Sequence, residues 1–356
     1  RAGQTVVILT RRPEVEEGIN SSHKNPSHCS EFTLPPNVTA TTDPEVALRS
    51  CRYIIHVLPV QSTDAFLRGE RVSAALRAHL SHVRAVVCCS KGLDTRTLAL
   101  PHEMLQAHFG NVPVVAFSGP TFAAELLRGA PSGAVVAAPT LRIAEECRAL
   151  FANGRLRIYP STDLLGVELA GALKNIIAII AGGLEGMGFG VNTTSLLVTR
   201  GAREITRLAV AAGGHEATMA GVAGIGDLML TCLGGLSRNK AVGYELGRGR
   251  SLPEVLEERE KSLAGVAEGV ATTPAAAELA RKLCVDAPLI NTCADILAGR
   301  TTPEEGLKKC MSSPAHEDAP IEPVRRLPTL AAGFVVGALT SALVACGRRN
   351  LEPRGR

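Results

Sequence analysis

Over roughly the first 160 residues, short apolar runs alternate with stretches that have apolar residues at helical spacing. The runs typical of strands are Thr5–Thr10, Tyr53–Val57, Ala85–Cys89, Val114–Ser118, Gly133–Ala138 and Leu156–Tyr159. Helices are predicted at Pro44–Arg52, Glu70–Leu80, Pro101–His108, Phe122–Arg128 and Leu141–Phe151. Continuous Val, Ile and Ala strands separated by helices favour a largely parallel sheet that is covered on both faces.

After Asp163 the pattern becomes helix after helix. We therefore predict an α/β domain over residues 1–160 and an all-α domain over 161–319, with the active site in the cleft between them. The remaining residues, 320–356, form a linker and a tail.

The tail contains an apolar run, Leu330–Cys346, flanked by arginine pairs. Its 17 residues fall short of the ~20 that a transmembrane helix usually needs. A membrane anchor, a helix packed on the body and a non-native tail all remain open, and the flanking arginines favour the anchor. We expect a cytoplasmic protein, tail-anchored to a membrane if this run is an anchor.

Charge and cysteine usage exclude several classes of protein. The formal net charge is +4, but residues from Pro323 onward hold six arginines and one glutamate, so the body is near neutral. Nucleic-acid binding requires clustered Lys and Arg, so we expect no nucleic-acid partner. The ten cysteines lack CxxC spacing and indicate free thiols in a reducing compartment, with no metal site.

The most informative residue is Lys174, which lies inside an apolar stretch, Leu164–Gly183, that is predicted to be a buried helix. Burying an ammonium group is costly unless it is paired or used. Ala170 one turn earlier and Gly166 two turns earlier are small residues that leave space beside the amine. A lysine on a rigid helix is suited to carry a proton. Alternatively, its stem covers apolar surface while its head reaches water.

Two further motifs follow predicted strands, where ligands bind in open α/β sheets. Ser90-Lys91-Gly92 places an amine at such a strand end, which is also common for a solvated loop charge. Ser118-Gly119-Pro120-Thr121-Phe122-Ala123 combines a glycine for close backbone approach with a helix start whose amides can donate to an oxyanion. By itself it is equally an ordinary strand-to-helix turn.

The helical half supplies a carboxylate and a phosphate-binding combination. Asp227 ends a glycine-rich segment that begins at Gly221. It could be a helix N-cap, or it could pair with Lys174 and tune the pKa of that amine. Ten residues later, Ser237-Arg238-Asn239 offers a guanidinium fork and an amide, which suit phosphate oxygens.

In this order the motifs resemble those of the NAD(P)-dependent glycerol-3-phosphate dehydrogenase family, in its bacterial-like form. The matching segments are Ile19-Asn20, His23, Asn25, Leu34-Pro35-Pro36-Asn37-Val38, Thr42-Asp43, Ser90-Lys91-Gly92, Ser118–Ala123, Gly171–Asn175, Gly224–Leu228, Ser237-Arg238-Asn239 and Val266–Val270. The resemblance covers about residues 1 to 312. It implies a Rossmann-type dinucleotide-binding domain, an all-α C-terminal domain, a homodimer and a role in glycerolipid synthesis.

The family implies a role for each matching residue. Lys174 would be the general base that takes the hydroxyl proton of glycerol 3-phosphate, with Lys91 and Asp227 completing the catalytic group. The substrate would contact the residues Lys91, Gly119, Thr121, Lys174, Asp227, Ser237, Arg238 and Asn239. The cofactor would contact Arg11, Arg12, Lys91, Ala123, Arg238, Val266 and Glu268. Hydride transfer of this kind needs a positioned cofactor and a proton carrier but no metal.

The sequence departs from the family at its front, where the first strand and the glycine-rich pyrophosphate loop have no counterpart. If Arg1 is a true start, we expect weak cofactor binding; if a longer product exists, the chemistry should be intact. After the first strand present, Arg11 and Arg12 stand where an NAD-preferring site often has an acid. Arginine there can meet a 2′-phosphate, so NADP is slightly favoured over NAD.

Two other functions remain open from the sequence. A related β-hydroxyacid dehydrogenase also uses a helix lysine, but on substrates that carry carboxylates. A truncated paralogue without cofactor binding would act as a partner or a membrane-tethered subunit.

Overall fold

The computed structural model describes residues 4–262 and 265–312. The predicted α/β region contains seven strands among these residues. They are β1 (Val6–Leu9), β2 (Val38–Thr41), β3 (Tyr53–His56), β4 (Ala85–Cys88), β5 (Val114–Ser118), β6 (Ser132–Ala137) and β7 (Leu156–Ser161). The sequence pattern missed β2, because its four residues include two threonines, one of them exposed, and follow two prolines.

The strands form two sheets. One has the order β3-β4-β5-β6-β7 and is parallel except between β5 and β6. The prediction of a largely parallel sheet is confirmed. The other consists of β1 and β2 in parallel, with Val6 opposite Val38. Among the described residues β1 is hydrogen-bonded only to β2, and β3 only to β4, so each keeps one unpaired edge.

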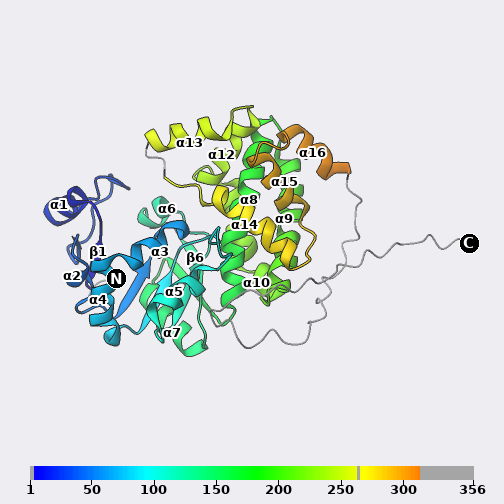
Figure 1. Cartoon of the computed structure of the whole chain (residues 1–356). Coiled ribbons are helices and arrows are strands. Elements are labelled where there is room, and N and C mark those ends of the chain that lie inside the picture. Colours follow the sequence, from blue (N-terminus) through cyan, green and yellow to red (C-terminus); the bar gives the residue numbers. More distant parts are fainter. Residues whose placement is uncertain (1–3, 263–264, 313–356) are drawn as a thin grey trace, which may run out of the picture. The chain divides into compact units, whose positions relative to one another are not determined.

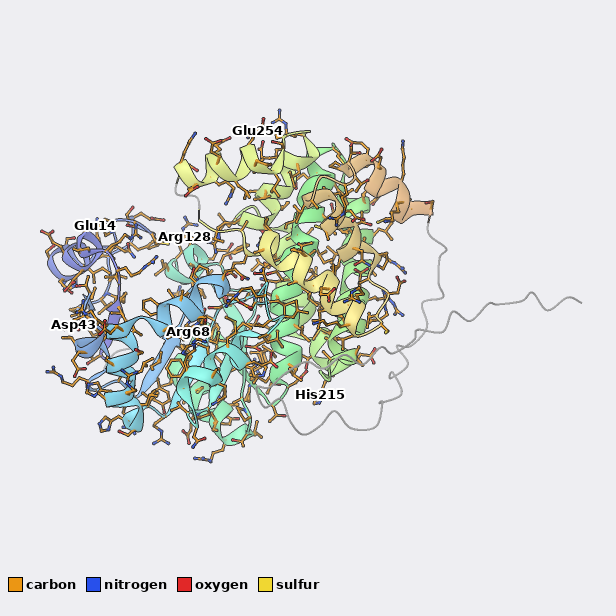
Figure 2. The ribbon with its side chains drawn as sticks, viewed as in Figure 1. Glu14, Asp43, Arg68, Arg128, His215 and Glu254 are labelled. Carbon is orange, nitrogen blue, oxygen red and sulfur yellow. The ribbon has the colours of Figure 1, made fainter. Side chains whose placement is uncertain are left out.

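Helices connect the strands, as the βαβ pattern requires. They are α1 (Pro13–Ser22), α2 (Pro44–Leu48), α3 (Val60–Arg68), α4 (Glu70–His79), η1 (Leu80–His82), α5 (Pro101–Phe109), α6 (Ala123–Leu127) and α7 (Leu141–Phe151). The sequence reading missed α1 and α3. Asp43, labelled in Figure 2, caps α2 by accepting a hydrogen bond from the Glu45 backbone N–H and pairs with Arg71 of α4 at 3.3 Å.

From Leu164 onward the structure is helical, as predicted. The elements are α8 (Leu164–Gly186), α9 (Val191–Ala211), α10 (Glu216–Met219), the π-helical turn η2 (Val222–Gly226), α11 (Asp227–Leu233), α12 (Arg238–Gly247), α13 (Leu252–Lys261), α14 (Glu268–Lys282), α15 (Pro288–Leu297) and α16 (Pro303–Ser312). In Figure 1, α8 runs in green through this region, and it packs against α9, α11, α12 and α14. Both regions belong to one compact unit of the chain.

Glycines bring α8 and α12 into backbone contact. A Cβ added at Gly182 would lie 1.9 Å from the Lys240 carbonyl oxygen, and one at Gly243 would lie 1.8 Å from the Ile179 carbonyl oxygen. The next turn repeats the pattern, with Gly247 against the Gly183 carbonyl at 2.1 Å. Only glycine permits this approach, so the crossing fixes the position of the start of α12 relative to α8.

Two described stretches, Leu164–Gly186 and Glu216–Leu233, are long and apolar enough to span a membrane by composition alone. The first is α8, whose most apolar window is 83% buried, so packing in the core accounts for its hydropathy. The predicted anchor, Leu330–Cys346, lies outside the described residues. All nine cysteines within the described part are free thiols, as the sequence predicted.

Candidate active site

Lys174 lies in the middle of α8, where the apolar sequence and the Asp163 N-cap produce a long buried helix. The residue is 6% exposed. Its amine donates hydrogen bonds to the Asp227 carboxylate and, at 2.8 Å, to the Thr231 hydroxyl. The predicted pairing with Asp227 is thus confirmed. The alternative of an N-cap is wrong, since Gly226 occupies that position and Asp227 is the first residue of α11.

A second amine reaches the same carboxylate from the sheet. Lys91 follows β4 in a loop, and its Nζ lies 2.6 Å from Asp227 Oδ2. The Ser118 hydroxyl, at the end of β5, lies 3.5 Å from the same oxygen. Both parallel strands end at this edge, so two strand ends and two helices converge on one acid.

Burial and charge set the pKa values of this cluster. Burial, followed by the neighbouring Lys91 charge, lowers the pKa of Lys174 from 10.5 to about 7, although Asp227 opposes the shift. Burial alone would raise the pKa of Asp227, but the positive charges of Lys91 and Lys174 outweigh it and lower that pKa. The result is an ionised carboxylate beside an amine that can bind or release a proton near neutral pH.

Close packing explains the glycine in Gly171-Ala172-Leu173-Lys174. A Cβ at Gly171 would lie 2.9 Å from Ser118 Oγ and 3.4 Å from Lys91 Cγ. The sequence reading placed the open space at Gly166 and Ala170. Instead Gly166 faces Asp163, whose Oδ2 would lie 2.0 Å from an added Cβ, so this glycine serves the helix cap.

The turn after β5 is equally crowded. A Cβ at Gly119 would lie 2.7 Å from the Ala134 Cα, so the glycine permits contact with β6. The Thr121 hydroxyl donates to the Gly119 carbonyl at 3.1 Å. The following helix, α6, has five residues and is shorter than the predicted Phe122–Arg128. Ala123 is its first residue and is exposed.

The Ser237-Arg238-Asn239 motif starts α12. Ser237 is its N-cap and accepts a hydrogen bond from the Lys240 backbone N–H. Asn239 is buried, and its Oδ1 accepts from the Gly269 N–H at 2.9 Å, beside the Asn175 carbonyl. This contact joins the motif to the start of α14, which in turn lies against the residue that follows Lys174. Arg238 is exposed, with its guanidinium beside Gly265.

Glu268, the first residue of α14, interacts with both the Lys91 loop and the Arg238 side chain. Its carboxylate accepts hydrogen bonds from the backbone N–H groups of Lys91 and Val60, and it faces the charges of Arg238 and Lys91. Burial nevertheless raises its pKa. Val266, two residues earlier, is 55% exposed and therefore accessible to a ligand.

The predicted cofactor residues near the front lie apart from this cluster in the described contacts. Arg11 and Arg12 are exposed at the end of β1 and the start of α1. The contacts that position Arg12 are local: its backbone N–H donates to Thr10 Oγ1, and its guanidinium lies 4.0 Å from Glu14.

Sequence reasoning missed two polar members of the site. Thr231 was recognisable, since it lies one helical turn after Asp227 and therefore on the same face. The Ser118 hydroxyl was seen only as part of a turn, because its approach to Asp227 depends on tertiary packing.

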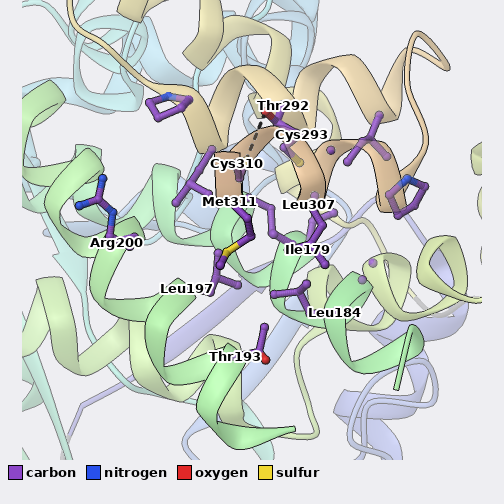
Figure 3. Close-up of a pocket in the computed structure, with 18 of the residues that line it drawn as sticks. Ile179, Leu184, Thr193, Leu197, Arg200, Thr292, Cys293, Leu307, Cys310 and Met311 are labelled. Atoms are coloured by element: carbon purple, nitrogen blue, oxygen red, sulfur yellow. Dashed lines mark hydrogen bonds between the residues drawn. The ribbon is translucent and has the colours of Figure 1, made fainter. Parts of the chain in front are cut away.

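A separate apolar pocket of about 390 Å³ lies among α8, α9, α12, α15 and α16. Figure 3 shows Ile179, Leu184, Leu197, Leu307 and Met311 directed into it. None of the predicted site residues lines this pocket.

Comparison with known proteins identifies the family. The model of the NAD-dependent glycerol-3-phosphate dehydrogenase N-terminus matches residues 1–144, and that of the C-terminus matches 163–308. Over 320 residues the chain is 38% identical to glycerol-3-phosphate dehydrogenase [NAD(P)+] of Acidobacterium capsulatum, covering 88% of this chain and 92% of the relative. It is also 38% identical to the chloroplastic glycerol-3-phosphate dehydrogenase [NAD(+)] 2 of Arabidopsis thaliana, covering 89% and 74%.

A solved structure agrees. The glycerol-3-phosphate dehydrogenase of Coxiella burnetii superimposes with a TM-score of 0.78 at 27% identity, covering 87% of this chain and 92% of that one. The fold and the site thus define a Rossmann-type α/β oxidoreductase with a helical C-terminal domain. Within that class, the chain belongs to the NAD-dependent glycerol-3-phosphate dehydrogenase family.

Proposed function

We propose that Lys174 is the proton carrier in the reaction of this chain. As a family member the chain is an oxidoreductase that interconverts sn-glycerol 3-phosphate and dihydroxyacetone phosphate with NAD(P). The observation that carries the proposal is the buried Lys174 amine, which is held by Asp227 and Thr231 and has a pKa of about 7.

In the oxidation direction, neutral Lys174 Nζ accepts the proton of the substrate C2 hydroxyl. NAD(P), when bound, would supply the hydride acceptor for C2. Lys91, which shares Asp227 with Lys174, is assigned to the oxygen that becomes a carbonyl, where its charge favours the partial negative charge. Asp227 fixes the positions of both amines by hydrogen bonds to each. In the reverse reaction Lys174 returns the proton to the oxygen.

The phosphate end of the substrate is assigned to Ser237, Arg238 and Asn239. The exposed Arg238 guanidinium can present a two-pronged donor to phosphate oxygens, while Ser237 and Asn239 are buried and fix its backbone. Gly119 and Thr121 are assigned to the sheet side of the substrate site.

The nicotinamide half of the cofactor fits the residues present. Ala123 and Val266 are exposed, and Val57 beyond the end of β3 is 68% exposed. We assign these accessible apolar residues to its lining. Lys91, Arg238 and Glu268 are the polar groups beside it. Arg11 and Arg12 are assigned to the far end, where they can bind a 2′-phosphate, so we place NADP slightly ahead of NAD.

Replacement of Lys174 by Ala tests the central assignment. Turnover of glycerol 3-phosphate should fall by about 10³-fold or more, while calorimetry should detect nucleotide binding close to wild type. Lys240→Ala is the matched control, because this lysine lies on the adjacent α12 and pairs with Glu185. Turnover retained in Lys174→Ala would refute the assignment, whatever the control shows.

The finer properties are also proposals. We propose a cytoplasmic homodimer that supplies glycerol 3-phosphate for glycerolipid synthesis, with domains at 1–160 and 161–319. The two family matches, 1–144 and 163–308, support that division. Light scattering tests the dimer, and a comparison of glycerol 3-phosphate with hydroxy acids tests the substrate.

A further inference from the structure

His56 ends β3 and is 6% exposed, and both nitrogens of its ring have partners. Nδ1 lies 3.0 Å from Ser90 Oγ, and Nε2 lies 3.2 Å from Thr63 Oγ1 on α3. Ser90 is the residue immediately before Lys91. A side chain that the motif does not contain is thus hydrogen-bonded to the loop that carries one of the two amines.

The proton positions follow from the neighbours. The Ser90 hydroxyl donates to the Leu58 carbonyl at 2.5 Å, so its oxygen must accept from His56, and Nδ1 carries the hydrogen. Nε2 lies 3.2 Å from the Thr63 hydroxyl, whose one hydrogen is shared between Nε2 and the Pro59 carbonyl at 3.3 Å. Cys88 Sγ lies farther from Nδ1, at 3.7 Å. A single neutral tautomer satisfies the ring, and burial lowers the pKa of His56 to about 4, which keeps it neutral.

The Lys91 loop is held from the other side by the helical region. The Glu268 carboxylate accepts from the Lys91 backbone N–H, and Asp227 holds its amine. Gly92 has a φ of +146°, and a Cβ there would lie 2.9 Å from Thr272 Oγ1. On the sheet side Ser90 Oγ bonds to the Leu58 carbonyl and to His56, and the Cys89 backbone N–H donates to the His56 carbonyl at 2.9 Å. Further along the loop, Gln61 of α3 donates to the Leu93 carbonyl at 2.7 Å.

We infer that His56 is a positioning residue for Lys91: through Ser90 it fixes the loop so that the amine meets Asp227. The inference rests on the proposed function, because it gives His56 a role in the geometry of the two lysines. His56 itself does not reach the reacting atoms. Its neutral state adds no further positive charge near the two amines.

The variant His56→Leu tests this in the whole chain. It removes both hydrogen bonds of the ring and fills the same space with an apolar side chain of similar size. We expect kcat to fall about tenfold to a hundredfold, with a smaller change in KM for either substrate. Thr63→Val removes only the Nε2 partner. His56→Asn keeps a donor near the Nδ1 position, so its kcat should lie between those of wild type and His56→Leu.

The pH dependence of glycerol 3-phosphate oxidation separates a positioning role for His56 from a purely structural one, because a structural role would leave it unchanged. The groups that face the Lys174 amine are Asp227, Thr231 and Cys232 of α11 and the Lys91 charge, which lowers the pKa of Lys174. When Lys91 loses its position, that pKa rises. The acidic limb of glycerol 3-phosphate oxidation should therefore move to higher pH in His56→Leu.

Val86→Ala is the control, because Val86 is a fully buried apolar residue of the adjacent β4. It should lower Tm without moving kcat or the acidic limb. Should His56→Leu behave like Val86→Ala, with only Tm reduced, His56 is a core residue and the inference is wrong. If His56→Leu does not fold, Thr63→Val and His56→Asn decide by the same two readouts. An active Lys174→Ala variant overturns the proposed function instead, so the two failures are distinguishable.

Discussion

Lys91 and Lys174 hold opposite oxygens of the same carboxylate. Lys91, from the loop after β4, lies 2.6 Å from Asp227 Oδ2, and Lys174, from α8, binds Oδ1. The acid is 1% exposed, so water cannot replace it. Two cations that would repel each other are thus held together by one buried anion.

Asp227→Asn should therefore affect both stability and turnover. The amide leaves two clustered amines without a counter-charge, and breaking such a buried pair costs about 3 kcal/mol or more in the free energy of unfolding. The pKa of Lys174 should fall further, because Asp227 raises it in the wild type. Urea unfolding and steady-state kinetics measure both effects.

Glu257→Gln is the control for that experiment. Glu257 pairs with Lys261 of α13 at 2.6 Å on the surface. Its loss should cost less than about 1 kcal/mol. Equal losses in the two variants would contradict the buried role of Asp227.

The rate of glycerol 3-phosphate oxidation should rise with pH through about 7, because Lys174 must be neutral to accept the proton and its pKa lies near that value. Reduction of dihydroxyacetone phosphate needs the protonated amine and should fall over the same range. Initial rates in both directions across a pH series measure this. An oxidation limb that does not respond in Lys91→Met, where the pKa of Lys174 should rise, would argue against the assignment.

Glu204 of α9 should make the protein less stable as pH rises. Burial raises its pKa from 4.5 to about 7, although the N–H groups of Leu289 and Ile290 hydrogen-bond its carboxylate. A raised pKa means that the neutral form stabilises the fold. That contribution is complete below pH 4.5 and is lost as pH rises through about 7, by about 3 kcal/mol in total.

Glu204→Gln isolates this contribution, because the amide does not titrate. The difference in unfolding free energy between wild type and Glu204→Gln should move in favour of the variant from pH 4.5 to pH 8. A difference that is flat across this range would contradict the raised pKa of Glu204.

The two arginines after β1 should affect NADP more than NAD. Replacing Arg11 and Arg12 by Ala removes the cations proposed to meet the 2′-phosphate, and a charged hydrogen bond of this kind is worth about tenfold in affinity. KM for NADP should rise by about that factor and KM for NAD should change little. Arg68→Ala, an exposed arginine on α3, is the control, and equal changes for both nucleotides would exclude the assignment.

Gly243→Ala should destabilise the protein by about 2 kcal/mol or more, because its Cβ would lie 1.8 Å from a backbone oxygen that cannot rotate away. It should also raise KM for the phosphorylated substrate by displacing α12. Gly183→Ala is a matched control on α8, where the added Cβ meets its nearest atom at an ordinary 3.6 Å. Thermal unfolding that ranks the two variants in the opposite order would refute the packing argument.

The sequence predicted most strands and the long buried helix α8, because continuous apolar runs and helical spacing report burial directly. It missed β2, whose four residues include exposed Thr39, and α3, which carries polar residues from Gln61 to Asp64. The pairing of Lys174 with Asp227 could be proposed, since a buried amine requires an anion. The sharing of that anion with Lys91, and the bond from His56 to Ser90, depend on how the sheet meets α8 and have no local signal.

The glycine contacts between α8 and α12 have a consequence for selectivity. Main-chain atoms, and not deformable side chains, set the span from the Lys174 amine to the Ser237-Arg238-Asn239 turn. In the proposed reaction this fixed span sets the distance between the phosphate and the reacting hydroxyl of the substrate. A phosphorylated alcohol one carbon shorter or longer would anchor its phosphate and leave its hydroxyl out of reach of the amine.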